Sequence, residues 1–370
     1  MAGGRVGLRL FPDLLEYLSR GRHVICVSGT NGKTTTTALV ARGWGGDVTT
    51  NDTGANMPAG HVAALAARAH SRVVLEVDEA WLPEVIRRST PEVVVLLNLS
   101  RDQLDRASEV RVLASKWREV LARSATTVVA NANDPLVVYA AEVAESVRWC
   151  DVATAWIDDA RSCPHCTRPL VHEETSWHCV CGFAKPSVIT SIATPTHARV
   201  GDTEVEIRLA LLGEFNRANA AMALTALREV GVDVGVASAR MADVTSVAGR
   251  FALRNFRGQD VRMLLAKNPA GFAALLEVVP ASPGEVWVAI NARLADGRDP
   301  SWLYDVPFEL LRGHRVRCFG ERRLDLAARL DYAGVEWRLD DGALEVIEEP
   351  IHLLANYTAF ADFLSETTLC

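Results

Sequence analysis

The sequence lacks the features that mark secreted, membrane-spanning and nucleic-acid-binding proteins. No stretch approaches about 18 uninterrupted apolar residues, so no transmembrane helix is predicted. Residues 1–20 carry charges throughout and contain no sustained apolar segment, which excludes a secretory signal. The formal net charge of -7 argues against a general nucleic-acid-binding protein. We therefore expect a cytoplasmic protein that neither spans a membrane nor binds nucleic acid.

Signs of a disulfide framework, of internal repeats and of low-complexity segments are also missing. The chain has 8 cysteines, which do not predict disulfides in the cytoplasm, but four of them fall within residues 163–181 and require another explanation. The length of 370 residues predicts two domains, since single domains typically run ~100 to 200 residues. Hydrophobic content of 49% with 23% charged residues is typical of a globular protein.

The order of apolar runs along the chain predicts an α/β protein. Continuous apolar runs at 22–28, 72–77, 92–98 and 126–130 are typical of strands buried on both faces of a parallel sheet. Amphipathic stretches such as 110–123 lie between them, which predicts a doubly wound α/β domain. A long helix is expected at 211–233, closed by Gly231. Strand patterns resume at 261–269, 285–299 and 314–320, and a last helix at 357–364 completes a second, smaller α/β domain.

The strongest chemical signal is the segment SGTNGKTT (28–35), which lies between a predicted strand and a predicted helix. Backbone N–H groups of such a loop hold phosphate oxygens, its lysine neutralises their charge, and a threonine hydroxyl reaches Mg²⁺. Val27 stands where the general P-loop pattern has its first glycine, so this loop is a variant. We predict that the nucleotide is held by Gly29, Thr30, Asn31, Gly32, Lys33, Thr34 and Thr35.

Several motifs in a fixed order resemble those of the Mur ligase superfamily, which also includes folylpolyglutamate synthetases. They are GTNGKTTT (29–36), NDTGAN (51–56), LEVDE (75–79), NLSRDQLDR (98–106), NANDP (131–135), GEFNRAN (213–219) and GRF (249–251). These enzymes use ATP to phosphorylate a carboxylate, and an amine then attacks the acyl phosphate. The resemblance implies ATP contacts at Asn216, Arg250 and Asn268, Mg²⁺ ligation by Thr34 and Glu76, and catalytic roles for Lys33 and Glu76.

Finer details resemble the MurT branch of the superfamily. Gln103 replaces the usual histidine of the 102–105 segment, and LAKNPAGF (265–272), ADGRDPSW (295–302) and ANYTAF (355–360) are similar to MurT signatures. The resemblance implies a partner glutaminase of the GatD type, which delivers ammonia. It also implies a lipid II substrate, whose D-glutamate α-carboxyl is amidated at the cytoplasmic membrane face. An aspartate among Asp296, Asp299 and Asp305 would face the glutaminase and orient its histidine, with Asp299 favoured and Asp296 second.

The resemblance also defines the expected domains. Residues 1–247 would form a Mur ligase-like central P-loop ATPase domain with an inserted zinc ribbon at about 160–187. Residues 248–370 would form a smaller, Rossmann-like α/β C-terminal domain. Members of the superfamily often carry a carbamylated lysine, and Lys116 lies in the corresponding region.

The cysteine cluster has the spacing of a structural zinc site. Two residues separate the first pair, a twelve-residue gap follows, and one residue separates the second pair; the four are Cys163, Cys166, Cys179 and Cys181. Four thiolates at such spacing suit tetrahedral Zn²⁺ and leave no open position for a substrate. Two alternatives are a redox or unmetallated cluster and the replacement of one thiolate by His165, His172 or His178.

Each of the other site predictions has a purely structural alternative. Glu76, Asp78 and Glu79 could form a solvated acidic turn, and Asn268 could cap a buried strand. Asp296 could belong to an Asp-Gly turn and Asp299 could be a helix N-cap followed by proline. For the whole chain, the alternatives are a stand-alone amino-acid ligase of the Mur or folylpolyglutamate type and a nucleotide-binding scaffold without catalysis.

Overall fold

The computed structural model describes residues 2–51, 54–101, 107–152, 158–244, 251–280, 282, 284–342 and 346–369. The chain divides into two compact units, Met1–Ser100 with Ser108–Thr245 and Arg101–Ala107 with Ser246–Cys370. Arg250, Gln103 and the predicted domain boundary at 247/248 lie outside the described residues. No helix in the described part of the chain is long and apolar enough to cross a membrane.

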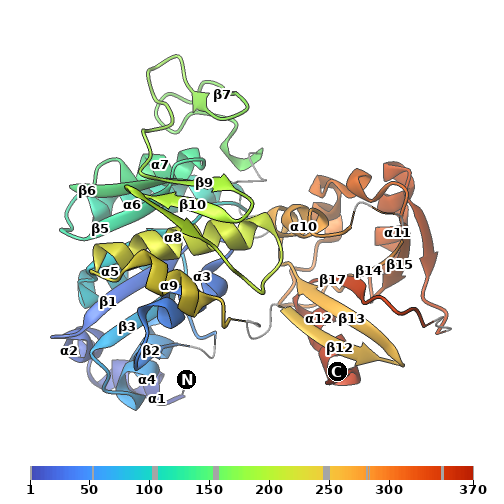
Figure 1. Cartoon of the computed structure of the whole chain (residues 1–370), viewed down its shortest axis with the longest axis horizontal. Helices are drawn as coiled ribbons and strands as arrows, with labels where there is room; N and C mark the ends of the chain where they lie inside the picture. The colour runs from blue at the N-terminus through green and yellow to red at the C-terminus, as the bar shows by residue number, and fades with distance from the viewer. Residues whose placement is uncertain are drawn as a thin grey trace. The chain divides into compact units, whose positions relative to one another are not determined.

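The first unit is built on a nine-stranded sheet (Figure 1). Its strands, in spatial order, are β11 (Thr203–Glu206), β10 (His197–Val200), β9 (Thr190–Thr194), β6 (Ser146–Asp151), β5 (Thr127–Asn131), β4 (Val93–Leu96), β1 (His23–Ser28), β3 (Arg72–Val77) and β2 (Val48–Thr50). The strands from β9 to β2 are parallel, and β10 is antiparallel to its two neighbours, β9 and β11. The parallel α/β sheet predicted from continuous apolar runs is therefore confirmed.

Helices cover both faces of this sheet, because alternate strand residues point to opposite sides. Ile25 and Val27 of β1 pack in one core with α3 (Lys33–Trp44), α8 (Glu214–Glu229) and α9 (Val234–Met241). Val24 and Cys26 pack in the opposite core. The helices on that side are α1 (Ala2–Leu10), α2 (Leu14–Ser19), α4 (Pro58–Ala67), α5 (Leu82–Ser89), α6 (Ala107–Leu121) and α7 (Pro135–Ala141), together with the short 3-10 helix η2 (Asp158–Ala160).

The antiparallel strands β9, β10 and β11 were not predicted from the sequence. They are only four or five residues long and mix polar with apolar side chains. Edge strands of this kind are half-exposed and therefore lack the continuous apolar runs of the central strands. Before them, the small hairpin β7 (Val171–His172) and β8 (Trp177–His178) carries the cysteine cluster and extends from the sheet (Figure 1).

The second unit has its own, seven-stranded sheet. Its strands, in spatial order, are β16 (Glu336–Leu339), β15 (Arg315–Phe319), β14 (Glu285–Ala289), β17 (Ile351–Ala355), β13 (Gln259–Leu265), β12 (Phe251–Phe256) and β18 (Thr368–Leu369). The strands from β16 to β13 are parallel, and β12 and β18 are antiparallel. Three strands were predicted here, so a smaller α/β unit was expected but its sheet is larger than the sequence indicated.

The helices of the second unit complete its core. These are α10 (Pro269–Leu276), η3 (Pro300–Asp305), η4 (Phe308–Leu311), α11 (Arg323–Ala333) and α12 (Tyr357–Glu366). One face of the sheet packs against α12 through Phe256, Trp287, Phe319 and Phe363. Phe272 of α10 stacks on Trp302 and Phe308 of the 3-10 helices.

Candidate active site

The loop between β1 and α3 has the backbone geometry that the GTNGK motif predicts. Gly29 and Gly32 have φ of +145° and +84°, a region that side chains other than glycine rarely adopt. A Cβ atom on Gly32 would also lie 2.7 Å from Oδ1 of Asn219. Gly32 is the N-cap of α3, and no side chain caps this helix. The free N–H groups of its first turn are therefore available to an anion.

Lys33 is the centre of this loop. Its ammonium is buried and donates to the carbonyls of Gly29 at 2.5 Å and Thr30 at 3.1 Å. It also forms an ion pair with Oε2 of Glu79 at 3.0 Å. The positive charge of Lys33 thus lies within the loop that leads into the uncapped start of α3.

The end of β4 fixes the conformation of the loop. The carbonyl of Asn98 accepts from the N–H of Thr30 at 3.0 Å, and Oδ1 of Asn98 accepts from the N–H of Asn31 at 2.9 Å. The hydroxyl of Thr30 donates to the carbonyl of Ser100 and accepts from the N–H of Ser100, both at 3.0 Å. Thr34 and Thr35 follow in the first turn of α3 and are half-buried.

Glu76 lies at the end of β3, opposite Val27 in the sheet, and is 4% exposed. Asn51 holds its backbone twice, because Oδ1 accepts from the N–H of Glu76 and Nδ2 donates to its carbonyl, both at 2.8 Å. Nε2 of His61 donates to the same carbonyl at 2.8 Å. No described residue forms a hydrogen bond or ion pair with the Glu76 carboxylate. Its oxygens remain available to a hard cation such as Mg²⁺.

His61 supports Glu76 as a neutral imidazole. It is fully buried, and burial lowers its pKa to about 4. Because Nε2 donates to the Glu76 carbonyl, Nδ1 is the unprotonated nitrogen, and it has no hydrogen-bond partner among the described residues. The support that Asn51 and His61 give to Glu76 was not predicted. It joins residues that are 15 and 25 positions apart in the sequence.

Glu79, rather than Glu76, is the partner of Lys33 in this structure. Burial raises the pKa of Glu79, and the charge of Lys33 opposes that rise. Nε1 of Trp117 on α6 donates to the Glu79 carbonyl at 2.9 Å and holds the turn in place. Oδ1 of Asp78 accepts from the N–H of Ala80 at 3.0 Å, so Asp78 stabilises the turn before α5. The sequence singled out the acidic trio but favoured Glu76 within it.

Asp134 connects the ends of two strands beside this site. Its carboxylate accepts from the N–H groups of Leu99 at 2.7 Å, Leu136 at 2.9 Å and Val137 at 3.2 Å. Burial raises its pKa to about 6, against the effect of these donors. Asp134 therefore caps α7 and fixes the loop after β4, which is a structural role for the NANDP motif.

Asn216 and Asn219 lie in the first two turns of α8 and are both buried. Nδ2 of Asn216, a predicted ATP contact, donates to the carbonyl of Leu212 at 2.6 Å. Asn219 is the residue that approaches the phosphate loop, at Gly32. Asn219 was part of the recognised motif but was not among the predicted contacts.

In the second unit, Asn268 and Asp299 are helix N-caps. Oδ1 of Asn268, which is 1% exposed, accepts from the N–H of Gly271 at 2.8 Å. Asp299 is exposed and precedes Pro300. Its carboxylate accepts from the N–H of Ser301 at 2.9 Å, and this hydrogen bond lowers the pKa of Asp299. The alternative that Asp299 is a helix N-cap followed by proline is thus confirmed. An additional role for either residue stays a prediction.

Asp296 belongs to a buried polar network between two signature segments. Its carboxylate accepts from the N–H of Arg293 at 3.2 Å, and from the N–H at 2.9 Å and the hydroxyl of Thr358. The side chain of Asn356 accepts from the N–H of Asn291 at 3.0 Å and donates to its carbonyl at 2.6 Å. The loop after β14 is therefore fixed to the start of α12, and the Asp296 carboxylate is already engaged. Asp305, at the end of η3, is exposed.

The four cysteines lie together, with all Sγ atoms within 4.8 Å of one another. Sγ of Cys163 is 3.6 Å from that of Cys181, and Sγ of Cys166 is 3.4 Å from that of Cys179. Thiolates about 2.3 Å from a shared Zn²⁺ in a tetrahedron would have similar separations. The donor set therefore fits a structural zinc ion. His165 bonds Oε1 of Glu142 at 2.8 Å and is not part of the cluster.

Two contacts attach this cysteine module to the first unit. Nε1 of Trp177 donates to the carbonyl of Ala132, next to β5, at 3.0 Å. Arg111 of α6 donates to the carbonyls of Ser162 at 2.7 Å and Cys163 at 3.2 Å. The module is therefore attached next to β5 and to α6, whereas Lys33 follows β1.

The arrangement at the end of β1 and β3 can perform metal-assisted phosphoryl transfer. A lysine and an uncapped helix terminus bind phosphate oxygens, and a carboxylate without a protein partner lies on the adjacent strand. Magnesium prefers such oxygen ligands together with phosphate oxygens. The described residues thus fit a nucleotide with its Mg²⁺, and the binding of that ion by Thr34 and Glu76 stays a prediction.

Comparisons with known proteins agree with this geometry. The family model "Mur ligase middle domain" matches residues 27–227, and the model "MurT ligase C-terminal" matches residues 265–360. The MurT subunit of lipid II isoglutaminyl synthase from Staphylococcus aureus is 30% identical over 90% of this chain and 83% of its own length. The MurT subunit from Streptococcus pneumoniae is 27% identical over 97% and 90%. A pseudomurein peptide ligase structure from Methanothermus fervidus aligns with a TM-score of 0.72 and 18% identity, covering 96% and 80%.

Proposed function

Because the chain belongs to the Mur ligase family of ATP-dependent ligases, and within it to the MurT group, we propose that it amidates the D-glutamate α-carboxyl of lipid II. The product would be D-isoglutamine in the stem peptide. The observation that carries this proposal is the buried Lys33 ammonium in the loop at the uncapped start of α3, with the Glu76 carboxylate on the neighbouring strand. That set binds a nucleotide, and the relatives' names supply the substrate.

The proposed reaction has two steps. A substrate carboxylate oxygen attacks the γ-phosphorus of ATP, the bond to the β-phosphate oxygen breaks, and ADP leaves. Ammonia then attacks the acyl carbon, the bond from that carbon to the phosphate oxygen breaks, and inorganic phosphate leaves with the proton that the nitrogen loses. Lys33 and the N–H groups of the first turn of α3 would hold the phosphates and stabilise the developing charge. Magnesium, when bound by Thr34 and Glu76, would add further charge neutralisation.

Ammonia would come from a glutaminase partner of the GatD type. The names of the relatives describe a glutamine-hydrolysing enzyme of which MurT is a subunit. Asp299 and Asp305 are exposed while Asp296 is buried, so the two exposed aspartates are better candidates to face a partner, and we favour Asp299. We propose that it orients the histidine of that partner.

We also propose that the protein is cytoplasmic and works at the membrane face, where a lipid-linked substrate is found. Helix α1 supports this, because Val6 and Leu10 are 58% and 68% exposed, next to the exposed Arg5 and Arg9. Such a basic, apolar helix face suits an anionic lipid surface. Vesicles with anionic lipids should sediment the wild-type protein but not a Val6→Ser/Leu10→Ser variant. Equal sedimentation of both would contradict the role of α1.

The cysteine module would hold one Zn²⁺ with a structural role. Metal analysis of the purified chain should find one zinc per chain, and Cys166→Ser should lose it and lower the thermal midpoint. An exposed-residue control on the same module, His178→Gln, should keep the metal. A wild-type protein without zinc after purification in its presence would contradict this assignment.

One assay separates the proposed reaction from the alternatives. The full chain, with ATP, Mg²⁺, ammonium and lipid II, should release ADP in proportion to a product whose mass differs by exchange of a carboxyl for a carboxamide. Addition of an amino-acid mass, when amino acids are supplied, would instead favour a stand-alone ligase. ADP release without any change in the precursor's mass would contradict the proposal.

A further inference from the structure

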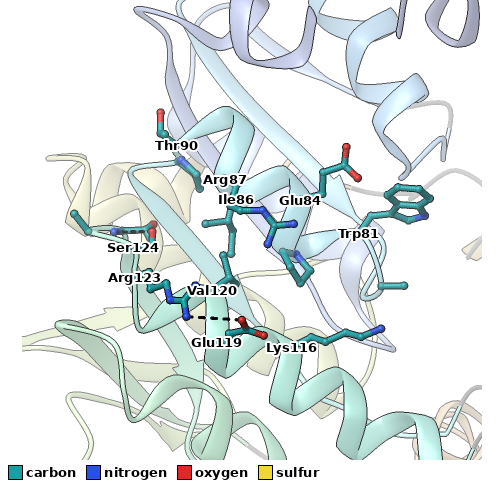
Figure 2. A pocket seen from close by; sticks show the side chains of 15 residues that line it. Trp81, Glu84, Ile86, Arg87, Thr90, Lys116, Glu119, Val120, Arg123 and Ser124 are labelled. Atoms are coloured by element: carbon teal, nitrogen blue, oxygen red, sulfur yellow. Dashed lines mark hydrogen bonds and ion pairs between the residues drawn. The ribbon is translucent and has the colours of Figure 1, made fainter. Parts of the chain in front are cut away.

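A groove between α5 and α6 lies beside the phosphate loop and has no assigned role. Its volume is about 860 Å³, within the usual size of ligand sites. Pro83 and Ile86 of α5 and Val120 of α6 form its apolar floor, and charged side chains surround it (Figure 2). All of its lining residues belong to the first unit.

The groove begins directly where the nucleotide site ends. Ala80 and Trp81, which line it, follow Glu79, and Glu79 is the ion-pair partner of Lys33. Trp117 of α6, next to Lys116 in the groove wall, bonds the Glu79 carbonyl at 2.9 Å. A substrate whose carboxylate reached the phosphate loop could therefore place its remaining parts in this groove.

The groove is lined by three cationic side chains, Arg87, Lys116 and Arg123. No described residue forms a hydrogen bond or ion pair with the exposed side chains of Arg87 and Lys116. Arg123 has only a long contact with Glu119 at 3.9 Å between two exposed side chains. The other carboxylate, Glu84, accepts from Arg88 at 3.1 Å. Arg87 and Lys116 therefore offer two positive charges to an anionic ligand, in a chain whose net charge is -7.

The two ends of the groove differ in chemistry. Trp81, which is 38% exposed, and Lys116 lie at one end in Figure 2, and Thr90, Ser124 and Arg123 lie at the other. An exposed indole offers a flat apolar face of the kind that packs against a sugar ring, and hydroxyl and guanidinium groups bind phosphate and sugar hydroxyl oxygens. Thr126 in the floor is buried, and its hydroxyl has no partner among the described residues.

We propose that this groove binds the sugar-linked diphosphate of the lipid-linked substrate, with Arg87 and Arg123 on the diphosphate and Trp81 on a sugar ring. The inference rests on the proposed function, since it takes lipid II as the substrate. It explains how a chain could select a diphosphate-linked muramyl peptide over a free peptide with the same carboxylate. The phosphate loop would act on the carboxylate, and the groove would position the glycan.

The test compares two substrates in the ammonium-driven reaction of the full chain with its partner subunit. One is a muramyl peptide diphosphate with a short, water-soluble prenyl chain, and the other is the same muramyl peptide without the diphosphate. Arg87→Gln/Arg123→Gln should raise KM about tenfold for the first substrate, as expected for lost charge-assisted contacts. KM for the second substrate and for ATP should not change. Arg199→Gln, at an exposed arginine of β10, is the matched control.

Three results would overturn the proposal. They are an unchanged KM for the diphosphate substrate, an equal rise for both substrates, and displacement of the sugar diphosphate by inorganic diphosphate at equal concentration. Trp81→Ala should weaken binding of the sugar diphosphate, and Trp81→Phe should retain it. Equilibrium binding of the fragment to the same variants keeps this test separate from the proposed function. If the wild-type protein amidates no substrate, the proposed function is wrong. The proposal for the groove is then still tested by whether the double variant binds the sugar diphosphate about tenfold more weakly than the wild type.

Discussion

The carboxyl ends of the two sheets differ in how their polar side chains are used. At the first sheet, α3 begins at Gly32 without a side-chain cap, and the Glu76 carboxylate has no partner among the described residues. At the second sheet, Asn268 caps α10, and Asn291 and Asn356 bond each other. Both edges have the strand-loop-helix pattern typical of ligand sites in α/β proteins. Among the described residues, the first edge leaves the start of α3 uncapped and the Glu76 carboxylate without a partner.

The difference shows that a polar strand end is not by itself a binding site. A buried polar group without a partner is costly, so proteins usually satisfy such groups internally. The second sheet follows this rule, and its polar residues stabilise the fold. The first sheet departs from it at the loop that holds Lys33. Substitutions at the two edges should therefore have opposite consequences for activity and for stability.

The largest effect is expected at Lys33. Lys33→Ala removes the ammonium that would hold the phosphates and should lower the rate of amide formation by about a hundred- to a thousandfold. Arg42→Gln, at an exposed position of the same helix, is the control and should keep full activity. A Lys33→Ala enzyme with normal turnover would remove the distinction between the two edges.

At the second edge, Asp296→Ala should act mainly on stability. It leaves the N–H groups of Arg293 and Thr358 without their acceptor, which should cost about 2 to 3 kcal/mol in urea unfolding.

Asp299→Ala should cost about 1 kcal/mol or less, because it removes one exposed cap. Asp299→Ala should also reduce glutamine-driven amidation while ammonium-driven amidation persists. Equal loss with both nitrogen sources would contradict the proposed contact with the partner.

His61 predicts a pH dependence for the first edge. Burial holds its pKa at about 4, below the value near 6.5 of an unfolded histidine, so the neutral form stabilises the fold above pH 6.5. That stability is lost as the pH falls from 6.5 towards 4. Between pH 7.5 and 5 the free energy of unfolding of the wild type should fall by about 2 kcal/mol more than that of His61→Gln. An identical fall in both proteins would show that His61 does not titrate in this way.

The smallest effect separates the two possible roles of Asn268. Asn268→Ala should lower stability by about 1 kcal/mol through loss of the cap, and Asn268→Asp should keep the cap because it retains the acceptor oxygen. If the amide group also contacts ATP, Asn268→Asp should raise KM for ATP at unchanged stability. A KM for ATP equal to that of the wild type would show that Asn268 acts only as a helix cap, and that the polar residues of the second sheet edge serve the fold.

The sequence predicted those parts of the molecule that depend on local patterns. Strands β1 and β3 were located within a residue, because their apolar runs are continuous and bounded by clear turns. The Lys33 loop and the four cysteines were identified because each motif lies in one short segment. The strands β9 to β11, and most strands added to the second sheet, are short or mixed in polarity and gave no such pattern.

Contacts between distant residues could not be predicted. The Lys33–Glu79 pair joins positions 46 apart, and the Asn291–Asn356 pair joins positions 65 apart. Each depends on which strands become neighbours, and residue type and local spacing do not determine that. For the same reason, Asn268 and Asp296 looked like site residues in sequence, whereas the structure shows their oxygens engaged within the second unit.

The central claim is that the loop around Lys33 transfers the terminal phosphate of ATP to a carboxylate. The most direct test uses lipid II in which both oxygens of the D-glutamate α-carboxylate are a heavy isotope. Mass analysis should find one labelled oxygen in the inorganic phosphate released for each amide formed, because the acyl carbon–oxygen bond breaks in the second step. Phosphate without label, at normal amide yield, would contradict the claim.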